Sequence, residues 1–214
     1  MLEGIHSINS STQGLPIIIK SVVLIHAACI LNDHTIATFI PPLSHSEMNR
    51  HWQNLVQQIE SQKRLILICI SRVKSRSSER NVESLFEGHA WPVLPSHDNE
   101  DDLEISGVIS LSSPESQTGP FRGLVQKLFV SPFHRRKHIA TNLLAELEKQ
   151  ALAMGRWSLM LDTMAGSPAE HMYPRLGYET LGVVKEYGFS PKDGSLVDEV
   201  FFWKDLRKAT LLAE

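Results

Sequence analysis

The sequence predicts an α/β (α+β) fold in which a mixed, mostly antiparallel sheet carries helices on both faces. The chain has 214 residues, 42% of them hydrophobic, which suits a single domain over residues 1–214. Apolar runs follow one another in the order helix, helix, strand, long loop, strand, strand, helix, strand, helix, strand, strand. The strand–helix–strand unit in the middle predicts a parallel pair, with antiparallel strands on either side of it.

The composition argues against several classes of protein. The formal net charge is -3 and the charged residues are spread along the chain, which does not suggest a nucleic-acid binder. Two cysteines, Cys29 and Cys69, are too few for a disulfide framework, and both lie in apolar runs. We therefore expect reduced, buried thiols in a cytoplasmic protein that binds no metal and is a monomer or a homodimer.

The first predicted element is a buried helix that begins near Thr12 and contains the apolar stretch LPIIIKSVVLIHAACIL, residues 15–31. A membrane span is the alternative, but the stretch is short for a span and contains Lys20 and His26. A signal peptide would place its charge before the apolar run and small residues after it. We expect no association with a membrane.

A second helix should begin at Ser44, because Ser44 and Glu47 form a capping-box pattern. The run RLILICIS, residues 64–71, is of strand length. Residues 72–102 are then rich in Ser, Arg, Asn, Glu and Asp, which marks a polar insertion. This insertion is either a solvated loop or a lid over a substrate site.

Regular structure returns with two strands at residues 103–112 and 123–131, then a helix over 136–154 and a strand over 156–162. The helix is predicted from apolar residues at helical spacing: Ile139, Leu143, Leu144, Leu147 and Ala151.

A short helix should start at Ser167, with Pro168 at its first position and Glu170 completing a capping box. Pro174 is expected to cut this helix at Tyr173. Two final strands, at residues 179–187 and 196–204, surround the turn SPKDG.

The start of the longer helix has an unexpected charge. Residues 135–137 are Arg-Arg-Lys, although a helix start carries partial positive charge and favours anions. Free backbone N–H groups together with basic side chains would hold a phosphate group well. The alternative is that three exposed cations simply lie in water, and spacing alone does not decide between the two.

This region resembles the acyl-CoA signature of the GNAT superfamily of N-acetyltransferases, Gln/Arg-x-x-Gly-x-Gly/Ala between a strand and a long helix. Residues 135–140 read RRKHIA, in which Arg135 and Ala140 fit the pattern and His138 stands where the family usually has Gly. A second block, GSPAEHMYPRLGY, keeps the family's Ala, Tyr and Leu-Gly-aromatic positions, with Gly166 where Asn is common. The stretches VQKLFVSP, LDTMAGSPAEHMYPRLGY and PKDGSL are similar to the tabtoxin-resistance acetyltransferase group.

The resemblance implies a sheet of about six to seven strands whose central parallel pair splays apart. Acetyl-CoA would be the co-substrate, with its pantetheine arm in the opening and its pyrophosphate on the helix start. An acceptor amine would attack the thioester directly, helped by a strand N–H near Val130. The implied cofactor-binding residues are Leu128, Phe129, Val130, Arg135, Arg136, Lys137, His138, Ile139, Ala140, Thr141, Ser167 and Ala169.

Tyr173 is implied as the acid that protonates the leaving thiolate, and its alternative is a core aromatic residue. Asp162 and Gln126 are the candidate substrate-binding residues, with Asp162 contacting the acceptor amine. The general base is left open: a water chain to Asp162 or Glu104, a histidine such as His134 or His138, or no base at all.

The leading hypothesis is therefore transfer of an acetyl group to the primary amine of a small amino-acid-like molecule, as in detoxification. Acetylation of a protein N-terminus or a lysine is the alternative within enzymes, and a non-catalytic CoA-binding module is the alternative outside them.

Overall fold

A computed structural model describes residues 2–74, 86, 94 and 101–210. Its seven strands form one sheet in the order β1-β2-β3-β4-β5-β7-β6. Their bounds are β1 Gly4–Ser7, β2 Arg64–Lys74, β3 Asp101–Ser112, β4 Arg122–Val130, β5 Ser158–Met164, β6 Glu179–Phe189 and β7 Leu196–Asp205. Neighbouring strands are antiparallel except for β4 and β5, so the predicted mixed sheet with one parallel pair is confirmed. Strand β1 was not predicted from the sequence.

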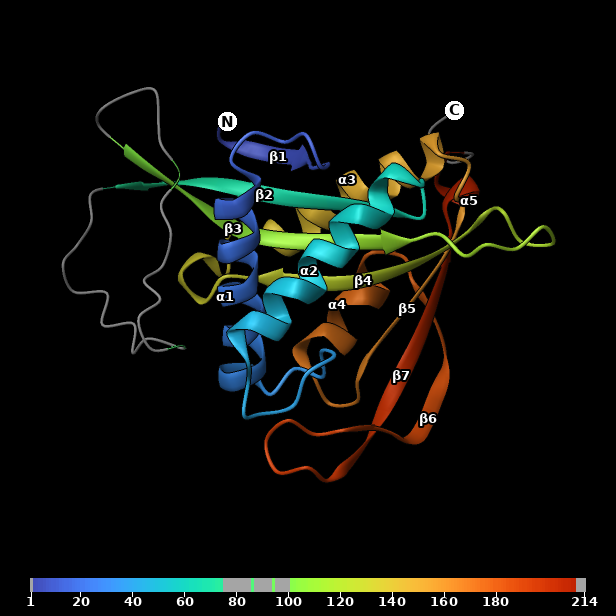
Figure 1. Cartoon of the computed structure of the whole chain (residues 1–214). Coiled ribbons are helices and arrows are strands. Elements are labelled where there is room, and N and C mark those ends of the chain that lie inside the picture. Colours follow the sequence, from blue (N-terminus) through green and yellow to red (C-terminus); the bar gives the residue numbers. More distant parts are fainter. Residues whose placement is uncertain (1, 75–85, 87–93, 95–100, 211–214) are drawn as a thin grey trace.

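Helices cover both faces of the sheet, as predicted. They are α1 Leu15–Asp33, α2 His45–Glu60, the 3-10 turn η1 Pro132–His134, α3 Ile139–Ala153, α4 Pro168–Arg175 and α5 Leu206–Thr210. Figure 1 shows α1 and α2 in front of the sheet, with α3 behind it. None of the described helices lies in front of β6 and β7, which extend away from α1, α2 and α3.

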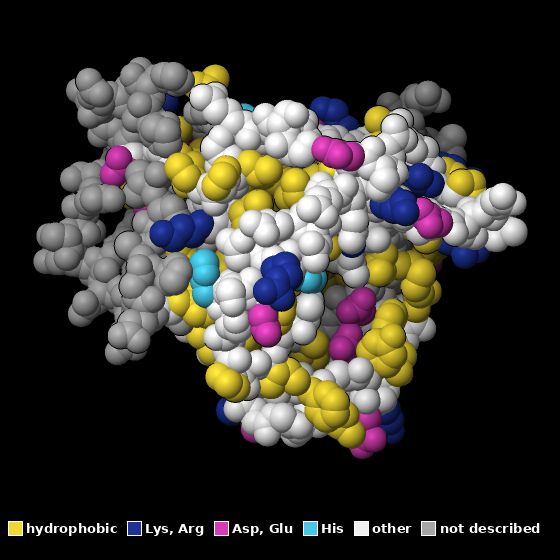
Figure 2. All heavy atoms as spheres, viewed as in Figure 1, with side chains coloured by type: hydrophobic (Ala, Val, Ile, Leu, Met, Phe, Trp, Pro, Cys, Tyr) yellow, Lys and Arg dark blue, Asp and Glu magenta, His cyan; other side chains and the backbone are white. Residues whose placement is uncertain are grey.

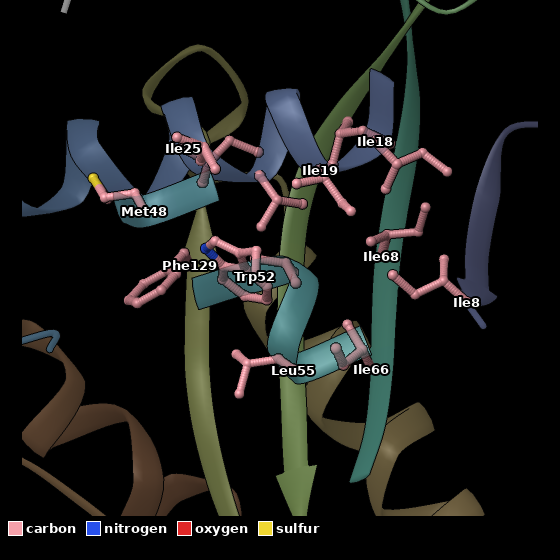
Figure 3. Close-up of a cluster of buried hydrophobic side chains, with 14 of the residues drawn as sticks. Ile8, Ile18, Ile19, Ile25, Met48, Trp52, Leu55, Ile66, Ile68 and Phe129 are labelled. Carbon is pink, nitrogen blue, oxygen red and sulfur yellow. The ribbon is translucent and has the colours of Figure 1, made fainter. Parts of the chain in front are cut away.

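Helix α1 is buried on nearly every side, which explains why its sequence is apolar all round. Its length and composition would suit a membrane span, but 67% of its most apolar window is buried in the fold. Figure 3 shows its Ile18, Ile19 and Ile25 packed with Trp52 of α2 and Phe129 of β4. The same cluster contains Ile66 and Ile68 of β2, so α1 belongs to the core on this face of the sheet.

The core on the opposite face is built by α3. All five of the apolar residues that predicted this helix are buried: Ile139, Leu143, Leu144, Leu147 and Ala151. They pack with residues of β3, β4 and β5, together with Tyr173 of α4. Burial of this stripe is what fixes α3 against the strands of the parallel pair.

Several predicted boundaries were wrong. Helix α1 begins at Leu15 and not near Thr12, because Thr12 lies in a turn that precedes the cap residue Gly14. Strands β2 and β3 pair as far as Lys74 and Asp101, so the strands include both ends of the predicted insertion. Most of residues 75–100 lie outside the described residues, and so does the predicted lid. Helix α4 continues through Pro174 to Arg175.

Candidate active site

The parallel strands β4 and β5 separate partway along their length. Their pairing ends at Leu124 and Met160, although β4 continues to Val130 and β5 to Met164. Within the described residues, the β5-facing edge of β4 therefore has no strand partner beyond Leu124. Its peptide groups are open to another molecule. The splay that the resemblance implied is present.

Strand β4 also contains a bulge at the place where it leaves β5. The register with β3 shifts by one residue between the pairs Val108–Phe129 and Ser110–Gln126. Lys127, inside this bulge, has a φ angle of 59°, which residues other than glycine rarely adopt. A bulge changes the direction in which the following side chains point. After this bulge, Phe129 is buried in the core beside α1 and α2, whereas Leu128 and Val130 are partly buried against the core beside α3.

Helix α3 begins three residues later than predicted, at Ile139, because its N-cap His138 is left-handed with φ of 58°. Arg136 is left-handed as well, with φ of 59°. Among the residues that the structure describes, no side chain caps this helix start. The N–H groups of Ile139, Ala140 and Thr141 occupy the first turn, where a helix offers no backbone acceptors. The Thr141 hydroxyl turns back and donates to the His138 carbonyl at 2.8 Å.

The basic side chains around this helix start differ from one another. Arg135 forms a two-pronged ion pair with Asp33, the last residue of α1, so its charge is already matched. Arg136, Lys137 and His138 are exposed. A phosphate group at this position would therefore meet Arg136 and Lys137, while Arg135 holds the loop against α1.

Helix α4 starts in the way that the sequence predicted. Ser167 Oγ accepts from the Glu170 N–H at 3.4 Å, and Glu170 Oε2 accepts from the Gly166 N–H at 2.6 Å. The Ser167 side chain is therefore already hydrogen-bonded to a backbone N–H group at the start of α4. Ala169 packs partly buried against the α3 core.

Tyr173, on the last turn of α4, is buried against Tyr178 and Phe202 at ring separations of 5.8 and 5.5 Å. Burial and the nearby charge of Asp162 raise the pKa of its phenol, so it remains protonated at neutral pH. Within the described part of the chain, no hydrogen-bond acceptor engages its hydroxyl.

Asp162 has a partner, Glu199, that was not predicted from the sequence. Asp162 is on β5 opposite Phe201 of β7, and Glu199 lies two residues further along β7 on the same face. Burial, a hydrogen bond to Asp162 and the charge of Asp162 raise the pKa of Glu199 to about 7. Asp162 is exposed and Glu199 is buried, so one carboxyl group of this acid pair is open to solvent.

The surroundings of Glu199 leave room for its carboxyl group. A Cβ atom at Gly188 of β6 would lie 2.6 Å from Glu199 Oε1 and 3.3 Å from Ile36 Cδ1. Ile36 belongs to the loop between α1 and α2, so this loop reaches across to the acid pair. Figure 2 shows acidic side chains in a hollow of this face, beside hydrophobic side chains.

A group of basic residues lies on the same side of the sheet, near the bulge. Arg64 of β2 donates to Ser110 Oγ at 2.6 Å, Gln126 Oε1 at 3.2 Å and Gln58 Oε1 at 2.8 Å. Gln126, a predicted substrate-binding residue, is thus bonded to Arg64. Lys127 donates to the Thr38 hydroxyl in the α1–α2 loop. Burial and the charge of Arg64 lower the pKa of Lys127 to about 8.

Two histidines adjoin this basic group, and both are neutral at pH 7. Burial and the charge of Lys127 lower the pKa of His26 to about 3 and that of His51 to about 4. His26 Nδ1 accepts from the Trp52 indole at 3.2 Å, so its Nε2–H donates to the Ala37 carbonyl at 2.7 Å. His26 therefore fixes the α1–α2 loop.

Several earlier candidates are engaged elsewhere. His134 is buried with its Nε2 3.2 Å from Glu104 Oε2, so this pair occupies two groups that were considered as proton acceptors. Both cysteines are buried, and burial raises the pKa of Cys29 to about 12, which makes it a poor nucleophile. Within the described ranges, no group of three or more His, Cys, Asp or Glu side chains could hold a metal ion.

The comparisons with known proteins agree with this geometry. The model of the acetyltransferase (GNAT) family matches residues 67–178, and the chain belongs to this family of enzymes. An N-acetyltransferase from Staphylococcus aureus Mu50 has a similar structure, with 16% identity and a TM-score of 0.61 over 95% of this chain and 99% of that chain.

Two further solved structures have the same fold. A ribosomal-protein-alanine N-acetyltransferase from Brucella melitensis is 16% identical, with a TM-score of 0.60 over 94% of this chain and 99% of that chain. A phosphinothricin acetyltransferase from Sinorhizobium meliloti, solved in complex with acetyl-CoA, is 19% identical, with a TM-score of 0.62 over 94% and 88%.

The residues of this chain fit acetyl-CoA as a co-substrate. The uncapped start of α3, with Arg136 and Lys137 exposed beside it, suits a pyrophosphate. The unpaired edge of β4 offers peptide groups to an extended arm that carries amides. These features lie at the predicted cofactor-binding residues of β4 and α3, whose contacts with acetyl-CoA stay a prediction. The Ser167 side chain is used by the cap of α4.

Proposed function

We propose that this protein transfers an acetyl group from acetyl-CoA to the primary amine of a small amino-acid-like molecule. The observation that carries the proposal is the acid pair, Asp162 and Glu199, beside the opening between β4 and β5. A carboxylate in that position attracts an ammonium group. The similarity of residues 122–206 to the tabtoxin-resistance acetyltransferases, and the fold shared with a phosphinothricin acetyltransferase, support a small acceptor. The protein would act in the cytoplasm.

The roles of the residues follow from their chemistry. Acetyl-CoA supplies an activated acetyl group as a thioester. Asp162 binds the acceptor as an ammonium ion, and Glu199 accepts the proton that must leave before the nitrogen can attack. A peptide N–H of β4 near Val130 stabilises the oxyanion that attack generates. When the oxyanion collapses and the C–S bond breaks, Tyr173 donates its phenolic proton to the leaving sulfur; Glu199 then releases its proton to solvent, and solvent returns a proton to Tyr173. The amine attacks the thioester itself, so no acetylated enzyme forms.

The pKa of Glu199 gives this mechanism a pH dependence. Glu199 can accept a proton only when it is ionised, so kcat/KM should rise as the pH increases through about 7. Glu199→Gln should lower kcat/KM by at least about tenfold and remove this rise. Asp198→Asn is a matched control on the neighbouring residue of β7, which points to the opposite face. If the rise persists in Glu199→Gln, another group is the proton acceptor.

The most direct test is transfer of isotope from labelled acetyl-CoA into a mixed pool of small amines, amino acids and peptides. Label in a small amine is the expected result. Label only in peptide N-termini or lysines would favour the protein acetyltransferase, which the fold shared with a ribosomal-protein-alanine N-acetyltransferase makes a real alternative. Binding of acetyl-CoA without any transfer would indicate a non-catalytic module.

A further inference from the structure

The basic residues at the β4 bulge have no use in the mechanism described so far. Arg64 is buried, with 7% of its surface exposed, and its hydrogen-bond partners among the described residues, Gln58, Ser110 and Gln126, are all neutral. Buried charges are normally matched by an opposite charge. In the part of the chain that the structure describes, no carboxylate lies within ion-pair distance of either Arg64 or Lys127.

A neighbouring group also lacks a partner. His51 Nε2 is buried, and within the described residues no hydrogen-bond partner contacts it. Buried ring nitrogens nearly always have a partner, so His51 Nε2 has a hydrogen bond available for a bound molecule. Lys127 adds further capacity, because an ammonium group has three donors and Thr38 takes one of them. Positive charge and free donors are therefore concentrated around Arg64, Lys127 and His51.

This basic group and the acid pair share one loop. The Thr38 hydroxyl accepts a hydrogen bond from Lys127. Ile36 precedes Thr38 by two residues and lies close to Glu199, because a Cβ atom at Gly188 would lie 3.3 Å from Ile36 Cδ1 and 2.6 Å from Glu199 Oε1. The loop between α1 and α2 therefore connects the two charged regions. A molecule held against this loop would meet acidic groups at one end and basic groups at the other.

Building on the proposed function, we propose that Lys127, backed by Arg64 and His51, binds an oxyanion of the acceptor, such as a carboxylate, while the acid pair binds its amine. The acceptor is then a zwitterion, and its acid group is required for recognition. The phosphates of acetyl-CoA do not account for this site, since Lys127 reaches toward α1 and α2, whereas the α3 start lies on the other face of the sheet.

The simpler alternative is that Lys127 only fixes the loop through Thr38. The two explanations differ in what Thr38→Val should do. If Lys127 only anchors the loop, Thr38→Val and Lys127→Met should have the same effects. If Lys127 binds an oxyanion, Thr38→Val frees its ammonium group and should leave recognition of an acid intact.

The test compares matched acceptors that differ only in the acid group: methionine with methioninamide, and β-alanine with β-alaninamide. The amine of the amide is the weaker base, so a larger fraction of it is unprotonated and reactive at pH 7. A faster reaction of the acid would therefore occur in spite of its less reactive amine. We expect the wild-type kcat/KM, from release of CoA thiol at pH 7, to favour at least one acid by roughly ten- to hundredfold. Lys127→Met should abolish this preference, while Lys127→Arg and Thr38→Val retain it.

Lys149→Met is the control, because it removes the same charge from an exposed position on α3. Equal rates with acid and amide in the wild type, or an unchanged preference in Lys127→Met, would overturn the anion site while leaving the acetyltransferase function intact. If neither kind of amine is acetylated, the proposed function fails.

Binding then decides the anion site separately from turnover. Calorimetry with CoA present should show N-acetylmethionine binding more tightly than N-acetylmethioninamide, and Lys127→Met should remove the difference. Equal binding of the two compounds to the wild type would show that no anion site exists.

Discussion

Helices α3 and α4 each follow one strand of the parallel pair, but their starts are built in opposite ways. At α4, Ser167 and Glu170 supply the caps, so the chain satisfies its own N–H groups. At α3 the cap residue is a left-handed His138, no side chain in the described part of the chain caps the helix, and basic side chains surround its start. The proposed function accounts for this difference: a closed α4 would hold Tyr173 in place, whereas an open α3 would hold a phosphate of acetyl-CoA.

Removal of the Tyr173 hydroxyl should have the largest effect. Tyr173→Phe keeps the ring and its packing but removes the proton that we propose is donated to the leaving sulfur. We expect kcat to fall by at least about tenfold, because a general acid contributes ~100- to 10,000-fold. Affinity for acetyl-CoA and the melting temperature should hardly change.

Tyr178→Phe is the control for this change, since it deletes a hydroxyl from the adjacent buried ring. An unchanged kcat in Tyr173→Phe would make Tyr173 a core aromatic residue. So would a loss of activity that matches a loss of thermal stability.

A carboxylate placed at the start of α3 should make this helix start resemble that of α4, with its N–H groups no longer available to an anion. In His138→Asp the carboxylate is attracted to the open N–H groups and repels phosphate, and Asp tolerates a left-handed backbone. We expect the dissociation constant of acetyl-CoA to rise roughly tenfold, equal to about 1.4 kcal/mol, and less at high salt. His138→Asn has the same shape without the charge and should bind nearly as the wild type does. Equal binding by both variants would mean that no anion sits there.

The two helix starts also show how far local sequence can predict structure. The start of α4 was predicted at the correct residue because its caps are neighbours in the chain, and the same holds for Ser44 at α2. The start of α3 was placed three residues early, because nothing local marks His138 as left-handed. The order of helices and strands could be predicted because the spacing of apolar residues shows which side of each element is buried.

Much of the site depends on contacts between distant parts of the chain. Glu199 approaches Asp162 only through the register of β5 with β7. Lys127 reaches Thr38 only because β4 has a bulge, and a bulge has no clear local signature. Glu199 was missed because it stood in a strand pattern as an ordinary polar residue. The one available signal was the position of this acidic residue in the largely apolar strand segment VDEVFF, residues 197–202.

Opening the start of α4 should have a smaller effect. Ser167→Ala removes the acceptor for the Glu170 N–H and should destabilise the protein by about 1 kcal/mol. For a chain of this size that lowers the melting temperature by roughly 2–4 °C. Since α4 carries Tyr173, kcat should fall as well. Ser44→Ala removes the same kind of cap from α2, where Ser44 Oγ accepts from the Glu47 N–H at 3.3 Å, and should lower stability without lowering kcat. Equal loss of kcat in both variants would break the link between the α4 cap and Tyr173.

The smallest expected effect is that of His138→Gly, and two opposing contributions decide its sign. A side chain in the left-handed region costs roughly 1–2 kcal/mol, which glycine avoids. Glycine loses more backbone freedom on folding, which costs roughly 0.5–1 kcal/mol. The balance should stabilise the protein by about 0.5–1 kcal/mol, seen as a melting temperature about 1–4 °C higher.

Binding of CoA separates strain from function at this residue. Glycine leaves the N–H groups in place and lets a phosphate approach more closely, so the affinity for CoA should be unchanged or higher. Gln62→Gly is the matched control, because Gln62 is left-handed with φ of 55° after the end of α2. It should give a similar gain in stability and no change in CoA affinity. Loss of CoA binding in His138→Gly alone would show that the imidazole itself contacts the cofactor, so that the α3 start depends on a side chain after all.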